Sequence, residues 1–170
     1  MKKLLSLDIS TSRIGVAIFE DKNLIHTECI NLTKIEKNPF IKLDVAIEAI
    51  DKLVRVHNVT HAAAEAALQK FTMGKSNAQT MNLLMSFNFA LSYAIRNMNV
   101  DISHVSFAHA RKLTKIQFIK KSSSAEKKEL IRQYCEKKYP FLVWPKKKTG
   151  TYKDENYDIS DAIIIGEACI

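Results

Sequence analysis

The opening of the chain alternates between apolar runs and short polar links. Lys3 to Glu20 contains two apolar runs joined by the link Ser10 to Ser12. Two β-rich runs joined by a short polar link predict a hairpin of buried strands. A third run, Leu24 to Leu32, follows turn residues at Asp21 to Asn23. The pattern therefore predicts a three-stranded antiparallel meander at the start of the chain.

The pattern then changes to helical spacing. Asn38 is a typical N-cap with Pro39 in the first helical position, and the predicted helix ends near Asn58. Val59 to Ala67 predicts a fourth strand, and the preceding helix makes a parallel crossover the natural connection. A long helix is predicted from Asn77 to about Asn97. Because its apolar residues cover more than one stripe, we expect it to pack centrally and to add a contact with a second subunit.

The second half of the chain predicts one more strand and three helices. Asp101 to Phe107 reads as a fifth strand, and Ala108 to Lys115 as a short helix. A helix from about Ala125 to Lys138 begins after serine caps and has acids first and lysines last, which matches the helix dipole. Lys146 to Gly150 predicts a mobile basic loop. The chain closes with a helix over Tyr157 to Ala168.

Composition is that of one globular domain spanning residues 1–170. The chain has 170 residues, of which 46% are hydrophobic. This length and this hydrophobic fraction are sufficient for a substantial core. No apolar run reaches the ~20 residues of a membrane span, and nothing at the start resembles a signal peptide. Cys29, Cys135 and Cys169 are widely spaced and odd in number, so we expect an intracellular setting, the cytoplasm of a bacterial or infected host cell.

Charge points to a polyanionic partner. The net charge is +8, and the basic residues concentrate after residue 110. A single lysine cluster is usually a solvated helix face, but a basic half of a chain favours nucleic acid.

Two carboxylates stand inside predicted strands. Asp8 ends the first apolar run, and Glu65 sits among alanines in the fourth. A buried carboxylate costs several kcal/mol unless it is paired with a metal ion or an arginine. Asp8 alone is equally well explained as the residue that opens a turn, and Glu65 as part of a helix start.

A second acidic pair changes this balance. Asp158 and Asp161 are three residues apart and share one face of the last predicted helix. Together with Asp8 and Glu65 they would form an all-oxygen site suited to Mg²⁺ or Mn²⁺. Two such ions support phosphodiester hydrolysis, and the surrounding lysines would hold the backbone. The pattern is typical of a nuclease.

At these positions the sequence resembles a known family. The stretches LDISTSRIGVAIF, AAAEAAL and YDISDAIIIGEA are similar to the RuvC-type Holliday-junction resolvases of the ribonuclease H-like superfamily. The resemblance implies catalytic and metal-binding roles for Asp8, Glu65, Asp158 and Asp161, with two Mg²⁺ or Mn²⁺ ions as cofactors. Asp154 and Glu155 compete with Asp158 for the third acidic position.

Two basic segments extend the resemblance. SSAEKKELI places Lys127 near the scissile phosphate, and ARKLTK matches a basic segment of the family. The family's junction-inserting aromatic is replaced by Leu68, and Phe71 is the candidate substitute. Ile9-Ser10 stands where bacterial members have Pro-Gly; phage and viral relatives vary here, which is compatible with a phage or viral origin. The candidate DNA-binding residues are Phe71, Lys75, Arg111, Lys112, Lys115, Lys120, Lys121, Lys127 and Lys128.

The resemblance implies an α/β, ribonuclease H-like domain. Its mixed five-stranded sheet would have the order 3-2-1-4-5, with strand 2 antiparallel and helices on both faces. It also implies a homodimer that resolves four-way or other branched DNA by paired nicking, without a membrane partner. Three alternatives stay open: a related nuclease acting on RNA or simpler DNA, a non-catalytic nucleic-acid binding module, and a sugar-kinase or actin-like phosphotransferase. The last needs two domains and a glycine-rich nucleotide motif, which this sequence does not contain.

Overall fold

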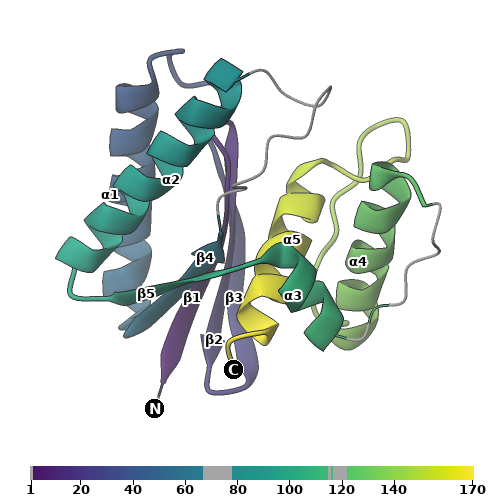
Figure 1. The fold of residues 1–170 in the computed structure, drawn as a ribbon. Helices are drawn as coiled ribbons and strands as arrows, with labels where there is room; N and C mark the ends of the chain where they lie inside the picture. The colour runs from purple at the N-terminus through teal and green to yellow at the C-terminus, as the bar shows by residue number, and fades with distance from the viewer. Residues whose placement is uncertain (1, 67–77, 115, 117–121) are drawn as a thin grey trace.

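A computed structural model describes residues 2–66, 78–114, 116 and 122–170 of the chain. Its centre is one five-stranded sheet with the order β3-β2-β1-β4-β5 (Figure 1). β2 is antiparallel to both β1 and β3, whereas β4 and β5 run parallel to β1. The strands are β1 (Lys3–Ile9), β2 (Arg13–Glu20), β3 (Asn23–Asn31), β4 (His61–Glu65) and β5 (Asp101–Val105). The predicted sheet order and strand directions are confirmed.

The two faces of the sheet are buried against different helices. Because side chains alternate along a strand, Leu5 and Leu7 of β1 enter one core cluster, and Leu4 enters the other. Ser6 and Asp8 share the face of Leu4. In β4 the same alternation places Glu65 on the face of Ala63, which belongs to the same cluster as Leu4. Both strand carboxylates therefore belong to one face of the sheet.

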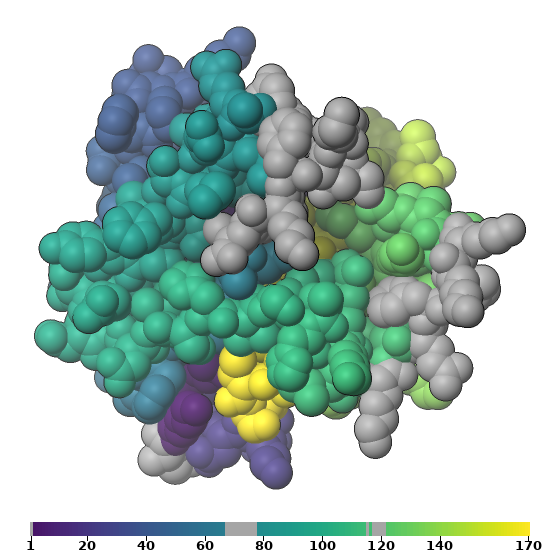
Figure 2. Space-filling view, in the orientation of Figure 1, coloured from purple at the N-terminus to yellow at the C-terminus, as the bar shows by residue number. Residues whose placement is uncertain are grey.

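Two helices, α1 (Pro39–His57) and α2 (Ala78–Asn97), cover the face opposite these carboxylates. α1 begins as predicted, with the Asn38 side chain accepting a hydrogen bond from the Phe40 N–H at 2.9 Å. α2 is not central: it buries Phe87, Leu91 and Ile95 and leaves Phe89 and Tyr93 exposed. In Figure 2 this helix, drawn in teal, lies on the outer surface of the molecule. The predicted central packing is wrong, because only one side of α2 meets the sheet.

The other face carries α3 (Phe107–Leu113), α4 (Ser124–Lys138) and α5 (Glu155–Glu167). α5 lies directly on β1 and β2, and α4 packs on its outer side (Figure 1). α4 begins with a capping box: Ser123 accepts from the Glu126 N–H, and Glu126 accepts from the Ser123 N–H. Reciprocal caps of this kind fix where a helix begins. The predicted helices are confirmed to within two residues at their starts.

The approach of α5 to the sheet is unusually close at both of its ends. A Cβ atom on Gly15 of β2 would lie 1.9 Å from the Asp158 carbonyl oxygen. A Cβ atom on Gly166 would lie 2.2 Å from the Phe19 ring. Between them, the buried Ser6 hydroxyl lies 2.8 Å from the Ala162 carbonyl oxygen and donates to it. Both glycines are therefore needed so that the helix can approach the sheet this closely.

Residues 146–152, here called the basic hairpin, form a hydrogen-bonded turn. Lys146 and Tyr152 pair in an antiparallel bridge, and the Lys147 N–H donates to the Thr151 carbonyl at 2.7 Å. Gly150 adopts φ +84° at the turn, a conformation that glycine accepts without steric cost. The sequence predicted a mobile basic loop at Lys146 to Gly150; the structure shows a hydrogen-bonded turn there, and the mobility stays a prediction. Within the described ranges no helix is long and apolar enough to cross a membrane.

The close approach at Gly15 gives a stability test. We expect Gly15→Ala to lower the free energy of unfolding by about 3 kcal/mol, because the new methyl group must push α5 off the sheet. Gly150→Ala is the matched control: nothing lies within 4 Å of its added Cβ atom, so only the positive φ costs energy, about 1 kcal/mol. Denaturant unfolding of the purified variants measures both. Equal losses for the two variants would show that the helix–sheet contact is not tight.

Candidate active site

Asp8 and Glu65 lie next to each other at one edge of the sheet. Leu7 pairs with Ala64 in the parallel β1–β4 ladder, so the following residues, Asp8 and Glu65, end these strands side by side. Parallel strands present their carboxyl ends at the same edge. The two acids, far apart in the sequence, therefore meet on the α5 side of the sheet.

α5 adds the second pair of acids. Asp158 lies in the first turn of this helix, where the dipole favours negative charge, and its backbone contacts Gly15, the register partner of Asp8. Asp161 follows on the buried side of the helix and is only 6% exposed. All four predicted carboxylates thus gather around the end of β1.

Burial raises the pKa of three of these carboxylates, Asp8, Glu65 and Asp161. Burial, followed by the charges of Asp161, Glu65 and Asp158, raises the pKa of Asp8 well above its ordinary value. Burial is also the main cause that raises the pKa of Glu65. For Asp161, burial raises the pKa to about 7, with Glu65 and Asp158 adding to the effect. These shifts are those of like charges held together away from water.

Two basic side chains oppose this repulsion. Lys128 of α4 lowers the pKa of Asp8, Glu65 and Asp161, and Arg111 of α3 acts on Glu65 and Asp161. Arg111 also stacks on Phe107, with its guanidinium carbon 4.1 Å from the ring centre. Arg111 was predicted as a DNA contact, and the structure places it beside the acids. Lys128, also one of the predicted DNA contacts, is likewise placed beside the acids, and the role that the resemblance implies for Lys127 stays a prediction.

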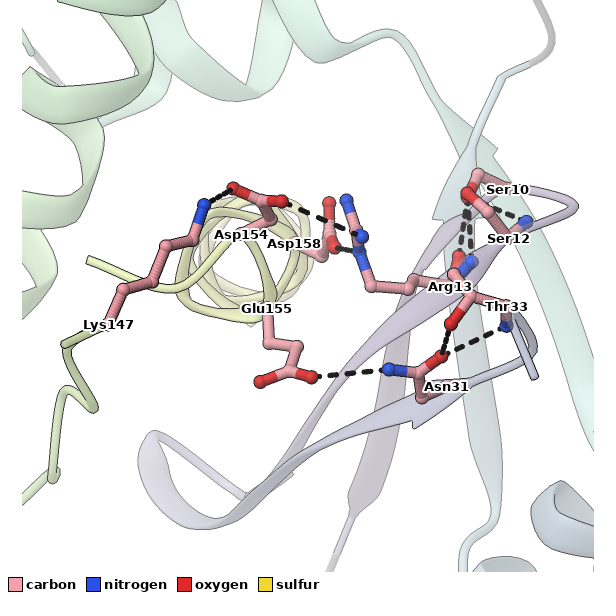
Figure 3. Close-up of polar contacts among 9 residues, drawn as sticks. All are labelled: Ser10, Ser12, Arg13, Asn31, Thr33, Lys147, Asp154, Glu155 and Asp158. Carbon is pink, nitrogen blue, oxygen red and sulfur yellow. Dashed lines mark hydrogen bonds and ion pairs between the residues drawn. The ribbon is translucent and has the colours of Figure 1, made fainter. Parts of the chain in front are cut away.

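Arg13 is a further residue of the site that sequence reasoning missed. Its Nε donates to Asp158 Oδ2 at 2.5 Å, and its Nη1 lies 4.0 Å from Asp154 Oδ2 (Figure 3). Ser10 closes the turn before it, since its hydroxyl accepts from the Arg13 N–H and donates to the Arg13 carbonyl. The available signal was an arginine directly after the turn that follows Asp8.

The four carboxylates supply the type of ligand that a hard divalent cation prefers, although they are not arranged closely enough to form a complete binding site. Asp161 Oδ1 is buried and has no hydrogen-bond partner among the described residues; such an atom usually has one. Carboxylate oxygens are the ligands that Mg²⁺ and Mn²⁺ prefer. However, the described part of the chain contains no group of three or more His, Cys, Asp or Glu side chains placed to hold a metal ion. Asp158 is engaged by Arg13 instead.

Asp154 and Glu155, the alternatives to Asp158 for the third acidic position, pair with residues outside the acid group. Asp154 pairs with Lys147, and Glu155 accepts a hydrogen bond from the Asn31 side chain at 3.2 Å (Figure 3). The charge of Asp158 is among the main causes that raise the pKa of Asp8, and this favours Asp158 for the third acidic position.

The remaining predicted DNA-binding residues fall into two groups. Lys112 is exposed on α3, and Lys127 is half-buried on α4. The others lie outside the described residues: Phe71, Lys75, Lys115, Lys120 and Lys121.

The strand order, the antiparallel second strand and the helices on both faces define a ribonuclease H-like fold. No protein-family model and no curated protein sequence matches the chain. Solved structures do match it. RuvC from Thermus thermophilus, in complex with a Holliday junction substrate, superposes with a TM-score of 0.70 at 10% identity, covering 99% of this chain and 92% of RuvC.

Two other solved structures share the fold. The yeast mitochondrial Holliday junction resolvase Ydc2 matches with a TM-score of 0.57 at 19% identity, covering 98% of this chain and 77% of Ydc2. A Cas12f1 chain, from a complex with guide RNA and target DNA, matches with a TM-score of 0.54 at 12% identity, covering 99% of this chain and 50% of its own length. The chain therefore has the fold of RuvC-type resolvases.

The raised pKa values give a pH test on metal-free protein. Asp161 has an ordinary pKa of 3.8, raised to about 7 in the fold, so between these values the folded state binds more protons than the unfolded chain. The contribution of Asp161 to the free energy of unfolding is therefore complete below about pH 4. It falls as the pH rises to 7, by at most about 1.4 kcal/mol per pH unit for one such group. Unfolding in EDTA at several pH values measures the slope.

Asp161→Asn should flatten this slope and leave the contribution of Asp8. Asp51→Asn, which alters an acid paired with Arg55 on α1, should leave it unchanged. Identical slopes for wild type and Asp161→Asn would contradict the electrostatic description of the site.

Proposed function

We propose that this chain is a metal-dependent endonuclease that cleaves four-way, Holliday-type DNA junctions. The observation that carries the proposal is the gathering of Asp8, Glu65, Asp158 and Asp161 at the end of β1, with a buried Asp161 oxygen that has no hydrogen-bond partner among the described residues. The likeness to RuvC and Ydc2 supports junction DNA as the substrate, because RuvC is bound to a Holliday junction and Ydc2 is a Holliday junction resolvase.

The chemistry follows from the charges of the site. Two divalent ions bound by the four carboxylates would activate water and stabilise the leaving oxygen of a phosphodiester. Asp8 and Asp161 favour such ions because each is costly to bury as an unpaired anion. Lys128 and Arg111 supply positive charge at the rim, where a phosphate of the bound strand would lie. Arg13 offsets part of the negative charge of Asp158 through its ion pair.

The same proposal includes a homodimer that presents two sites to the junction. The exposed apolar side chains of α2 support it: Phe89 is 74% and Tyr93 is 60% exposed. Exposed aromatic residues grouped on one helix are typical of a protein interface. Paired nicks need two active sites, which a dimer supplies.

One observation favours a second candidate, a nucleic-acid binding module without catalysis. The Arg13–Asp158 ion pair occupies one of the four carboxylates, so the acids could stabilise a basic protein internally. The experiment that tests the endonuclease also separates this candidate, because the module binds DNA and leaves it intact.

Labelled four-way junctions, duplex DNA and RNA, each incubated with Mg²⁺, Mn²⁺ or EDTA, test the endonuclease. We expect nicks near the crossover of the junction only when a metal is present. Asp8→Asn should abolish cleavage and leave binding measurable, because one ligand is lost and the basic surface is kept. Asp44→Asn, which alters an acid on α1, is the control and should cut normally. Unchanged nicking by Asp8→Asn would overturn the site, and binding without nicking by the wild type would favour the module.

The dimer is tested by molar mass in solution. We expect the wild type to elute with the mass of two chains, and Phe89→Ser combined with Tyr93→Ser to elute as a monomer, because the apolar contact is lost. Phe141→Ser, which alters an exposed aromatic residue elsewhere, should leave the mass unchanged. A monomeric wild type, in the presence and absence of junction DNA, would refute the dimer.

A further inference from the structure

We propose that Arg13 and Lys147 form a phosphate-binding subsite beside the candidate active site, and that Asp154 occupies it as an internal substitute for the phosphate. The ligand is the phosphodiester backbone of the strand that passes the acids. This inference rests on the proposed function, because it assumes that the chain binds nucleic acid.

The side chains of Asp158, Arg13, Asp154 and Lys147 are linked in this order by contacts between opposite charges. Asp158 pairs with Arg13, Arg13 lies 4.0 Å from Asp154, and Asp154 accepts a hydrogen bond from Lys147 Nζ at 2.9 Å (Figure 3). Asp154 therefore lies between two cations that come from different elements, β2 and the basic hairpin. A carboxylate bridging an arginine and a lysine has the charge and hydrogen-bonding capacity of a backbone phosphate.

Asp154 is suited to leave this position. Its side chain is 55% exposed, and Lys147 is 47% exposed, so water can replace the ion pair at little cost. Asp154 is also the residue before α5, and its side chain makes no capping hydrogen bond to that helix. Because its side chain pairs with Arg13 and Lys147 and does not cap the helix, we expect that α5 is kept when Asp154 releases these two cations.

The subsite continues the candidate active site. A hollow of about 280 Å³ is lined by Arg13, Lys128, Asp154, Tyr157 and Asp158, among others. A second hollow of about 290 Å³ is lined by Arg13, Lys147, Lys153, Asp154 and Glu155. Both share Arg13 and Asp154, so a strand bound near Lys128 could continue past Arg13 to Lys147.

The basic hairpin holds Lys147 in place. Tyr152 stacks on the guanidinium of Arg132 at 3.6 Å, and Arg132 is itself buried and paired with Glu129 and Glu136. At the base of the hairpin, the Asn156 side chain donates to the Pro145 carbonyl at 2.7 Å. A cation held by a fixed turn loses less conformational freedom on binding than one on an unstructured segment.

Binding to a four-way junction in EDTA, measured over a range of salt concentrations, tests the subsite without any cleavage. Asp154→Asn removes the competing charge, so we expect it to bind about twofold to fivefold more tightly, the range of one exposed charge pair. Its salt dependence should steepen by about 0.9 for each additional phosphate that the protein neutralises. Asp51→Asn, which also removes an acid from a surface ion pair, is the matched control and lies on the opposite face of the sheet.

Removing the positive charge of Lys147 tests whether this lysine contributes to DNA binding. Lys147→Gln should bind about twofold to fivefold more weakly, and Asp154→Asn should tighten binding less in the Lys147→Gln background than alone. Lys22→Gln, at the exposed turn between β2 and β3, controls for net charge.

The outcomes separate the subsite from the proposed function. If Asp154→Asn binds no more tightly than Asp51→Asn, or Lys147→Gln no more weakly than Lys22→Gln, the subsite is refuted. If the wild type binds junctions without nicking them, the endonuclease fails, and the same comparisons still decide the subsite. A wild type that binds no nucleic acid refutes both.

Discussion

The close contact between α5 and the β1–β2 hairpin is the constraint on which the rest of the structure depends. Gly15 lets the first turn of the helix touch the strand, and Gly166 does the same for its last turn against Phe19. The buried hydroxyl of Ser6 bonds to the helix between them. Because Asp8 is the register partner of Gly15, the contact that packs the core also brings Asp158 and Asp161 to the end of β1.

This arrangement stores electrostatic free energy in the fold. Asp8, Glu65 and Asp161 are held away from water with their pKa values raised, and the hydrophobic contacts of α5 offset that cost. Lys128 and Arg111 relieve part of the repulsion between the acids. Asp161 also has a buried carboxylate oxygen without a partner among the described residues, which is a cost that selection for stability alone would remove.

Much of this could be predicted from local sequence. The strands, the helices and their order follow from apolar periodicity, and the spacing of Asp158 and Asp161 puts both on one helix face. Contacts between distant segments could not be predicted in this way. Nothing near Arg13 or Lys147 indicates that they share Asp154, because that requires the relative placement of β2 and the basic hairpin. The one-sided packing of α2 was missed for the same reason, since a broad apolar surface does not say which side meets the sheet. That Lys128 acts on the acids could not be read from the sequence either, because it depends on how α4 is rotated against α5.

The alternating charges have a consequence for how the site and the basic hairpin depend on each other. Asp158 belongs to the acid group and also to the series of ion pairs that links it through Arg13 and Asp154 to Lys147. If a cation among the acids drew Asp158 away from Arg13, the guanidinium would need another anion, and Asp154 or a phosphate could supply it. If a phosphate took Lys147 and Arg13, Asp158 would be freer to turn toward the other acids. Metal and nucleic acid would then each favour binding of the other through a shared arginine, which is reciprocal coupling between two sites.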